Sequence, residues 1–432
     1  MFALSLIIKQ DRLELHGSSL TPPLRGCVRH TTERLQNGHC RERLDLVLQG
    51  SPGESQPFIA CLQSFLERMR LGQPAHLQLQ SEPRLEAASS RVYAGDFTWI
   101  NGSVQPRGIG LRLELERDET WFYPWRALPL SNRYGDRVVG GIRVDNRNDS
   151  FGENTVRVSA GDISGDLPAP LRLTLRNDIL SEQHIRNLYL GMRREVNTLP
   201  LLAGESAQSE LTFGVVPSAA CNGAAYGLVQ WSAAAEQCLL YWVVPSAVVE
   251  GLHGAALRPL ARFALVPDED LWLYWRVLQG GLFYQSSPQR IQAGLQLQLL
   301  PLICLPAVLP GFGSPADLRL ELWGCAAAAG NHSLALDAVF LFGLDGWRSL
   351  QPLDGGSLAY GQSLVDDHAQ GSAVIVWEGG MQSTYRTAGS GLWLAAQQSC
   401  LLQVLYDHGA QCAVEGAIHL AAEVQPRVRV LP

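Results

Sequence analysis

The stretch Leu111-Arg112-Leu113-Glu114-Leu115-Glu116 alternates apolar and charged residues, and this period of two decides the fold class. Successive side chains of an extended strand point to opposite faces, so the leucines lie on one face and the charges on the other. The same alternation recurs at Leu4-Leu6-Ile8, Leu44-Leu46-Leu48, Leu77-Leu79, Leu171-Leu173-Leu175, Leu295-Leu297-Leu299, Leu318-Leu320-Leu322 and Val428-Val430. The sequence therefore predicts a mainly β protein whose antiparallel sheets have one core face.

One segment departs from this pattern and predicts a helix. Between Pro57 and Leu71 the apolar residues recur at spacings of three and four, which is typical of an amphipathic helix. Ser55 and Pro57 supply start signals, and Gly72 supplies the stop signal. We predict a single helix, residues 57–71, in a chain otherwise made of strands and turns.

A turn-rich stretch around Pro129, Asn132 and Gly135 divides the chain. Residues 1–128 form one predicted domain, and residues 129–200 contain a linker and the first strands of a sandwich. Residues 201–432 follow as a jelly roll or other β-sandwich, because short strands punctuated by Gly, Asn, Asp and Pro are typical of such folds. The sequence leaves open whether one long jelly roll or two sandwiches fill the region after residue 129.

The charge balance excludes several functions. The chain has 432 residues and a net charge of −7, and 33 of its 34 basic residues are arginines, with Lys9 the single lysine. A phosphate-binding Walker loop needs a lysine after its glycines, and a nucleic-acid partner needs a basic face, so we expect neither. The nine cysteines contain no Cys-x-x-Cys pair, which favours buried residues in a reducing compartment.

The uncharged run Ile291–Ala316 raises the question of a membrane span. Three prolines, Pro301, Pro306 and Pro310, interrupt it. Lipid cannot replace the backbone hydrogen bonds that prolines break, so we expect no membrane span. A buried extended segment and an apolar contact with another chain remain the two interpretations. The N-terminus lacks the pattern of a signal peptide, so we do not expect export.

The acidic clusters favour turns over catalysis. Three of them could hold calcium or act as a glycosidase pair: Asp145-Asn146-Arg147-Asn148-Asp149, Asp268-Glu269-Asp270 and Asp366-Asp367-His368. Asp and Asn also stabilise turns through their own backbone, and that interpretation is preferred for each cluster. No nucleophile elbow or zinc-binding His-Glu-x-x-His motif occurs. We therefore predict no enzymatic activity, no catalytic or metal-binding residue and no cofactor, with a carboxylate hydrolase as the rival hypothesis.

Aromatic residues give a second hypothesis, a glycan-binding surface. Trp and Tyr rings stack on sugars, and the candidate contacts are Trp272, Tyr274 and Trp393. Alternation in Leu271-Trp272-Leu273-Tyr274-Trp275 places Trp272 and Tyr274 on one face of a strand. One face of this strand must be core, so core packing is the competing interpretation.

The order of predicted elements resembles the distal tail proteins of long-tailed bacteriophages. Strands Leu4–Ile8, Leu13–Leu15 and Leu44–Leu48 precede helix Pro57–Leu71, and strands through Leu111–Glu116 follow it. The segments Leu128-Pro129-Leu130-Ser131-Asn132 and Asp162–Leu173 are similar to the barrel end and the sandwich strands of such proteins. The resemblance implies a tail-tube-like β-barrel over residues 1–128 and no catalytic residues. The region around Leu334–Trp347 is also similar to a carbohydrate-binding jelly roll.

From this resemblance we expect a structural tail or baseplate protein that forms a closed ring with itself, six-fold as the family implies. It would contact neighbouring tail proteins, carry a glycan-binding outer sandwich, and reside in the virion after assembly in the host cytoplasm. Five apolar residues are the candidate contacts between subunits: Leu299, Leu302, Leu305, Val308 and Phe312. A capsid decoration protein and a stand-alone carbohydrate-binding protein are the alternatives.

Overall fold

The computed structural model describes residues 3–17, 20, 24–49, 52–82, 85–100, 108–132, 135–146, 154–178, 184–194, 201–249, 254–307, 316–352, 356–376, 382–407 and 417–429. The chain divides into two compact units. The first comprises Met1–Arg126 together with Ser164–Ala169 and Gln425–Pro432, and the second comprises Ala127–Ile163 and Pro170–Val424. Each unit is described by itself below.

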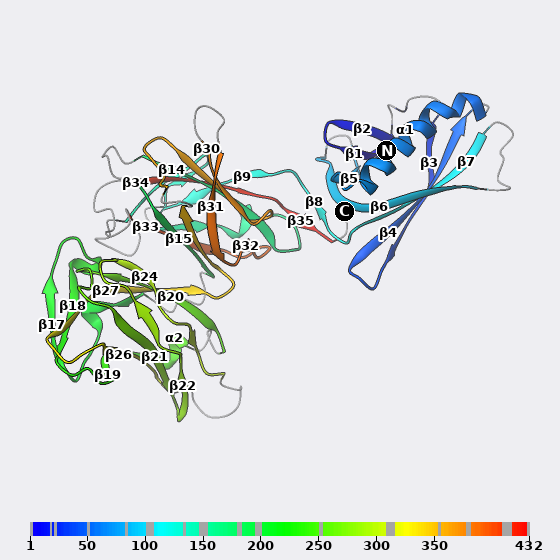
Figure 1. Ribbon diagram of the computed structural model, residues 1–432. Coiled ribbons are helices and arrows are strands. Elements are labelled where there is room, and N and C mark those ends of the chain that lie inside the picture. The colour runs from blue at the N-terminus through cyan, green and yellow to red at the C-terminus, as the bar shows by residue number, and fades with distance from the viewer. Residues whose placement is uncertain are drawn as a thin grey trace. The chain divides into compact units, whose positions relative to one another are not determined.

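The first unit is a single antiparallel sheet with the strand order β2-β1-β5-β6-β7-β4-β3, to which β8 and β35 add (Figure 1). Leucines at alternate positions of β1, β4 and β7 are fully buried, as the alternation predicts. The strands are β1 Ala3–Ile8, β2 Asp11–His16, β3 Leu24–Arg34, β4 His39–Gln49, β5 Ala75–Gln80, β6 Ala88–Trp99, β7 Gly108–Asp118, β8 Trp121–Phe122 and β35 Arg427–Val428.

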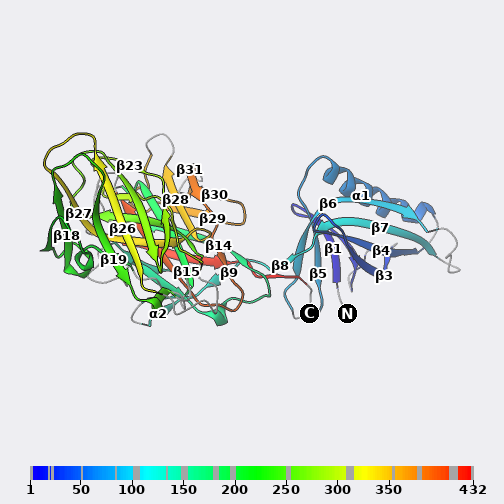
Figure 2. The same ribbon diagram turned by 90° about the horizontal axis from the view of Figure 1, so that it is seen from below.

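The predicted helix is confirmed as α1, Pro52–Arg70, which begins five residues before the predicted start. Proline suits the first turn of a helix because its φ is already helical and its missing N–H would have no partner there. Gly72 ends the helix at φ +82, and its N–H donates to the Met69 carbonyl at 2.9 Å. Apolar side chains of α1 pack on one face of the sheet. Figure 2 shows the helix lying along the strands of this sheet.

The strand pairing does not show the closed barrel that the resemblance implied for residues 1–128. Within the described residues the sheet is open, with β2 and β3 at its edges. The two edges approach at one point, where the Cys27 backbone N–H donates to His16 Nδ1 at 3.1 Å. Two register shifts near the start of β3, at Leu24/Gly26 and Cys27/Arg29, disturb the ladder there, and such bulges end strand pairing.

The second unit contains two layered β regions, and the first is a 14-stranded sheet. Strand β31 pairs with β28 on one side and β30 on the other, so it links the two halves of this sheet. Its strands are β9 Arg126–Leu128, β10 Leu130–Ser131, β11 Arg137–Val138, β12 Ile142–Asp145, β13 Thr155–Val158, β14 Ala169–Asn177, β15 Asn187–Arg194, β28 Trp347–Pro352, β29 Ser363–Asp367, β30 Ser372–Val376, β31 Gln382–Gly389, β32 Trp393–Leu394, β33 Cys400–Asp407 and β34 Ala417–Val424.

The second region, here called the inserted sandwich, comprises residues 201–343 and lies in sequence between β15 and β28. Its seven-stranded sheet contains β16 Leu202–Ala203, β17 Thr212–Pro217, β18 Ala225–Trp231, β20 Ala256–Phe263, β24 Leu297–Leu299, β25 Ile303–Cys304 and β27 His332–Gly343. Its five-stranded sheet contains β19 Gln237–Val244, β21 Leu271–Gln279, β22 Leu282–Gln285, β23 Gln289–Ile291 and β26 Leu318–Ala326. Short helices are α2 Ser246–Val249 and the 3₁₀ turns Ala160–Asp162, Gly204–Ser206 and Asn222–Ala224.

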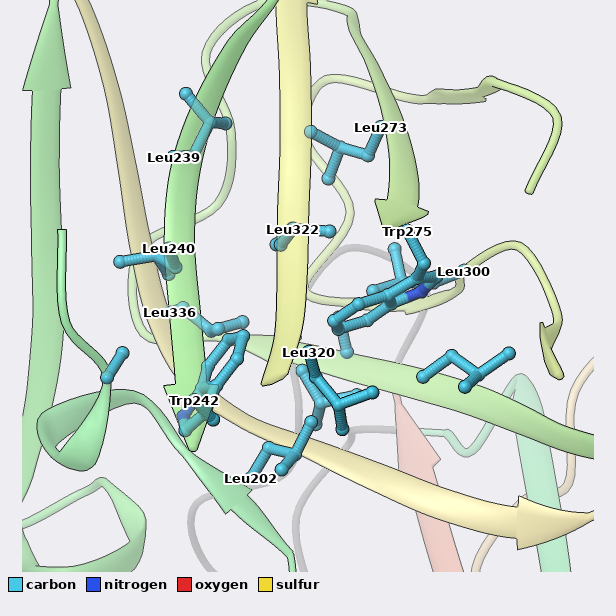
Figure 3. Close-up of a cluster of buried hydrophobic side chains, with 14 of the residues drawn as sticks. Leu202, Leu239, Leu240, Trp242, Leu273, Trp275, Leu300, Leu320, Leu322 and Leu336 are labelled. Carbon is cyan, nitrogen blue, oxygen red and sulfur yellow. The ribbon is translucent and has the colours of Figure 1, made fainter. Parts of the chain in front are cut away.

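The core of the inserted sandwich lies between its two sheets (Figure 3). Trp242 of β19 and Trp275 of β21 meet there with ring centroids 6.1 Å apart, surrounded by leucines of both sheets. We predicted residues 201–432 as a jelly roll or other β-sandwich and left open whether one or two sandwiches follow residue 129. In the structure, β28, β29, β33 and β34 pair with strands of residues 142–194, and residues 201–343 form a core of their own.

The outer face of the seven-stranded sheet is covered by the 14-stranded sheet. Phe340 and Phe342 of β27 form a cluster with Tyr189 of β15 and Leu405 of β33. All residues of β27 except Ser333 and Gly343 are buried, because both faces of this strand are covered. The second unit is therefore two β regions joined through an apolar interface.

No helix among the described residues is long and apolar enough to cross a membrane.

Candidate functional site

The predicted glycan contacts on β21 lie on the outer face of the five-stranded sheet. Leu271, Leu273 and Trp275 point into the core, so the predicted alternation of this strand is confirmed. Trp272 is half-buried, but Tyr274 is 0% exposed. A sugar can stack only on an uncovered ring face, so Tyr274 does not offer the predicted surface.

Tyr274 is covered by two neighbours on the same face. The Trp323 ring lies 6.2 Å from it in a stacked arrangement, and the Arg276 guanidinium lies 3.6 Å from the centre of the Trp323 ring. The Tyr274 hydroxyl donates to Glu236 Oε2 at 2.8 Å, and burial followed by this hydrogen bond raises the pKa of Tyr274 to about 12. The group is a packed cation–π stack that stabilises the sheet.

Trp393, the third predicted glycan contact, does not join the other two. It lies on β32, which pairs with β14 in the 14-stranded sheet, and is 37% exposed. Trp272 belongs to a different sheet of the inserted sandwich. The three aromatic residues therefore do not form one surface.

The predicted contacts between subunits divide into three groups. Leu305 is buried in the core of the inserted sandwich, so it is not available to another chain. Leu299 is partly buried against the apolar interface of the second unit, and Leu302 is half-buried. Val308 and Phe312 lie outside the described residues. The run between Leu299 and Leu305 thus fits the interpretation as a buried extended segment.

The acidic cluster Asp268–Asp270 has structural partners. The Ala293 backbone N–H donates to Asp270 Oδ1 at 2.9 Å, and this bond, with the Arg290 guanidinium, lowers the pKa of Asp270. Glu269 Oε1 lies 2.5 Å from His332 Nδ1. These contacts agree with the interpretation of the cluster as turn chemistry.

The cluster Asp366-Asp367-His368 is buried. Arg348 Nε donates to Asp366 Oδ1 at 2.9 Å, and Asp366 Oδ2 lies 3.2 Å from His368 Nε2. His368 Nδ1 accepts the backbone N–H of Leu392 at 2.9 Å, which places the proton of the neutral ring on Nε2. Burial raises the pKa of Asp366 to about 6 and lowers that of His368 to about 3.

Burial shifts the pKa values of Asp366 and His368 in opposite directions, and both shifts favour the neutral form. Asp367 is bound separately, by Arg172 at 2.8 Å and by the backbone N–H of Ala369 at 3.0 Å. Because the side chains of Asp366 and His368 are fully buried, no substrate reaches them in this conformation. Asp366 Oδ2 and His368 Nε2 are buried and have no hydrogen-bond partner of good geometry among the described residues, so the pair lies in the core at some cost in free energy.

The third acidic cluster is described only at Asp145 and Asn146, and Arg147–Asp149 lie outside the described residues. Asp145 pairs with Arg143 at 3.2 Å. Asn146 is buried, and its carbonyl accepts a hydrogen bond from Arg262 Nη1 at 2.9 Å. Arg262 also pairs with the buried Asp337, whose Oδ1 accepts the Asn222 N–H at 2.8 Å. Asn146 therefore has a structural role at the interface between the two β regions.

A polar pocket at one end of the inserted sandwich was missed by the sequence analysis. It has a volume of about 480 Å³ and lies where the chain leaves β18 and enters β19, beside the start of β17. Its polar lining residues are Glu210, Thr212, Gln230, Trp231, Ser232 and Gln237. The lining comes from three separate segments, each with one to three polar residues, so no local motif marked it.

Possible metal ligands and cysteine thiols were located in the part of the chain that the structure describes. No group of three or more His, Cys, Asp and Glu side chains is placed there to hold a metal ion. Eight described cysteines are free thiols, and Cys61 on α1 is exposed, unlike the buried cysteines that we expected. The absence of catalysis stays a prediction.

No protein-family model matches the sequence, and no curated protein does. Among solved structures, the chain is similar to the Dit protein of phage SPP1, described as a paradigm of the hub adsorption apparatus in Gram-positive infecting phages. That likeness covers 99% of both chains at 6% identity and a TM-score of 0.33. A chain of the phage P2 baseplate, in its activated conformation with Ca, is similar over 76% of this chain and 100% of its own, at 8% identity and a TM-score of 0.24.

The VP2 subviral particle of infectious bursal disease virus is similar over 72% of this chain and 82% of its own, at 11% identity and a TM-score of 0.18.

Proposed function

We propose that this chain is a non-enzymatic structural protein of a bacteriophage tail or of a phage-tail-like particle, and that its first unit closes a homo-oligomeric ring. The sequence resemblance to distal tail proteins motivates the assignment, with six-fold symmetry as the family implies. In this role the protein resides in the virion after assembly in the host cytoplasm, and neighbouring tail proteins are its partners.

The open sheet of the first unit is the observation that carries this proposal. Its edge strands β2 and β3 pair with a neighbour on one side only among the described residues. An unpaired edge exposes backbone N–H and C=O groups that can pair with another chain. Since β2 already approaches β3 at Cys27, the length of β3 beyond that point, which includes Val28, is the edge that the next copy can extend in a ring.

Exposed residues of β3 fit such a contact. Val28 is 71% exposed on this eleven-residue strand, next to the charged Arg29 and three residues after Arg25. The face of β4 and β7 opposite α1 is paired within the chain, with Arg43 Nε bound to Glu114 at 2.9 Å and Arg112 bound to Asp45 at 2.8 Å. The edge is therefore better suited to assembly than the charged face, whose ion pairs already have their partners.

Light scattering combined with negative-stain imaging tests the proposal. We expect closed rings of uniform size for the unaltered protein. Val28→Lys places a charge on the β3 edge and is expected to lower the ring fraction at least tenfold at equal concentration, since one uncompensated charge repeats at every contact. Leu71→Lys is the matched control, because Leu71 is also an exposed apolar residue of the first unit, 76% exposed at the end of α1.

Two other outcomes distinguish the alternatives. A strictly monomeric protein at all concentrations contradicts the ring and favours a stand-alone carbohydrate-binding protein. Binding to preformed capsids without binding to tails favours a decoration protein.

A second role, recognition of a cell-surface glycan, is proposed for the inserted sandwich. Residues 201–343 have their own core and lie between two strands, β15 and β28, which pair with each other. A region inserted in this way can carry a function of its own without disturbing the sheet that holds it. Binding of host-envelope glycans by the full chain, measured on a glycan array, tests this role.

A further inference from the structure

Strand β17, Thr212–Pro217, is an unprotected edge of the seven-stranded sheet. Among the described residues it pairs with β18 alone, and Figure 1 shows it at the margin of the inserted sandwich. Residues 211–235 contain no Asp, Glu, Lys, Arg or His, and the pairing of β17 with β18 has no register shift. Natural sheets usually protect an edge with charges, bulges or very short strands. Six neutral residues in regular pairing leave this edge able to bind a further strand.

The backbone of β17 presents hydrogen-bonding groups away from β18. The Ser218 N–H donates to the Ala224 carbonyl at 2.9 Å, and bonded and non-bonded residue pairs alternate along an antiparallel ladder. Every second residue before Ser218 therefore bonds to β18, and the residues between them, Phe213 and Val215, point their N–H and C=O groups outward. Pro217 belongs to the same outward series, so its missing N–H costs no bond to β18. Within the described part of the chain, no other residue bonds these outward groups, so they are available to a neighbouring strand.

The side chains of β17 leave room for a second strand. Val215 is 51% exposed, and nothing lies within 4 Å of the position that a Cβ atom would take on the exposed Gly214. Glycine weakens the interior of a strand, and it often marks a place where another backbone approaches closely. Phe213 packs against the core of the inserted sandwich. The strand is therefore held by its own sheet and core, whereas its outer edge is available.

The sequence of this edge is complementary to itself. When a second copy of β17 lies antiparallel with Gly214 opposite Gly214, Phe213 of each copy lies opposite Val215 of the other. These are the outward-facing residues, so each of the two pairs can form N–H···O=C bonds in both directions. Aromatic and β-branched side chains are favourable cross-strand neighbours, and on the other face Thr212 lies opposite Val216. No like charges meet in this register, whereas a charged segment of another protein would find no counter-charge here.

We propose that β17 pairs with β17 of a second copy of this chain around a two-fold axis at Gly214, so that the seven-stranded sheets of the two copies form one continuous sheet. A two-fold contact relates the copies by a half-turn, whereas neighbours in a larger ring are related by the smaller rotation of that ring. The β17 contact is therefore different from the contact between ring neighbours. It joins two rings, or two single chains where no ring forms, so it goes beyond the proposed ring and does not depend on it.

Cysteine cross-linking of the full chain tests the register. Gly214→Cys places two thiols opposite each other at the two-fold axis, where the Cα atoms of a close antiparallel pair lie about 4.5 Å apart, within the range of a disulfide. The background is Cys61→Ser, which removes an exposed thiol of α1. We expect Gly214→Cys to form a disulfide-linked dimer on mild oxidation. Val216→Cys is the matched control on the same face of the strand, because it lies opposite Thr212, and its yield should be at most about a tenth as high.

Sedimentation equilibrium measures the contact without a cross-link. In the Val28→Lys background, which removes the proposed ring contact, we expect a monomer–dimer equilibrium. Val215→Pro removes the outward N–H of each copy and no bond to β18, so it should weaken the dimer about tenfold or more. Val215→Thr keeps the N–H and the β-branched shape, and its dimer should be as stable as that of the parent. Unchanged tryptophan fluorescence shows that each variant keeps the core of the inserted sandwich.

Monomers at every concentration in the Val28→Lys background, or a Gly214→Cys yield no higher than that of Val216→Cys, would overturn the pairing of β17 with itself. Dimers that Val215→Pro leaves unchanged would show that another surface joins the copies, and would overturn it as well. Rings without the Gly214→Cys cross-link contradict this contact alone, whereas the cross-link without rings contradicts the ring proposal alone.

Discussion

The sheet of the first unit and the seven-stranded sheet of the inserted sandwich bury their strands differently. Strand β4 of the first unit alternates strictly between buried and half-buried positions, because α1 covers one face and paired charges cover the other. Strand β27 is buried almost throughout, because a second sheet covers one face and the 14-stranded sheet covers the other. Alternation of buried and exposed residues along a strand thus indicates a sheet with one solvent-accessible face. Continuous burial indicates that a second structural layer covers the other face.

The buried carboxyl groups of the two units differ in the direction of their pKa shifts. In the first unit, burial alone would raise the pKa of Glu42, but the hydrogen bond from His30 and the charge of Arg117 lower it below its ordinary value. In the second unit, burial raises the pKa of Asp337 although Arg262 opposes the shift. The charged form of Asp337 is therefore less well compensated by Arg262 and the Asn222 N–H than that of Glu42 is by His30, Thr32 and Arg117.

The largest effect is expected at that interface. Asp337→Ala leaves the buried Arg262 guanidinium without its carboxylate and the Asn222 N–H without its acceptor. Removing one partner of a buried pair typically costs about 3–5 kcal/mol, so the free energy of unfolding of the second unit should fall by that amount. Urea unfolding monitored by tryptophan fluorescence measures it.

The matched control is Asp345→Ala, an exposed carboxylate just beyond β27, for which we expect less than about 0.5 kcal/mol. Equal effects of the two substitutions would show that the buried Arg262–Asp337 pair does not stabilise the second unit in solution.

A smaller loss is expected from Gly191→Ala. A Cβ atom at this position of β15 would overlap the buried Phe342 ring, which belongs to the apolar interface. Overpacking of this kind typically costs about 1–3 kcal/mol. Gly214→Ala on β17 is the control, since nothing lies within 4 Å of its Cβ position. Thermal unfolding of both variants separates the two cases. If Gly191→Ala proved as mild as Gly214→Ala, the covering of β27 by the 14-stranded sheet would be in doubt.

The third prediction concerns the sign of the pH dependence. The lowered pKa of Glu42 gives the first unit stability that is present above pH 4.5 and is lost as pH falls through the folded pKa. Asp366 acts oppositely: its pKa rises from 3.8 to about 6 on folding, so its contribution to stability falls as pH rises between these values. His368 opposes Asp366, because a folded pKa of about 3 against 6.5 gives stability that rises with pH over that range.

Substitution separates these contributions. Glu42→Gln should reduce the loss of stability of the first unit below pH 4.5. Asp366→Asn should make the free energy of unfolding of the second unit rise more steeply between pH 4 and 6, since only the His368 contribution remains there. Chemical denaturation at a series of pH values measures both, and an unchanged slope in Asp366→Asn would contradict the assigned burial of that carboxyl.

Local patterns predicted the elements whose environment is simple. The helix and the alternating strands of the first unit could be predicted because each has one apolar face. Residues 52–56 of α1 were not predicted, since they lie outside the apolar pattern. The opposite faces of Trp272 and Trp275 followed from the same periodicity.

Features that depend on contacts between distant segments of the chain could not be predicted from the sequence. The return of β28 to pair with β15 joins positions about 160 residues apart across the insertion, and no pattern in either strand records the partner. Tyr274 was a reasonable surface residue by alternation, and only the neighbouring strand's Trp323 reveals that its ring is covered. The polar pocket needs three chain segments, so Glu210, Gln230 and Gln237 each look ordinary in sequence.

Single-particle imaging of the purified chain at near-residue resolution tests the central claim most directly, because it shows which surface joins the copies. We expect closed rings of uniform order in which β3 of one copy meets the sheet edge of the next and the inserted sandwich stays outside the contact. A monomer at every concentration, or rings joined through the inserted sandwich while β3 remains free, would contradict it.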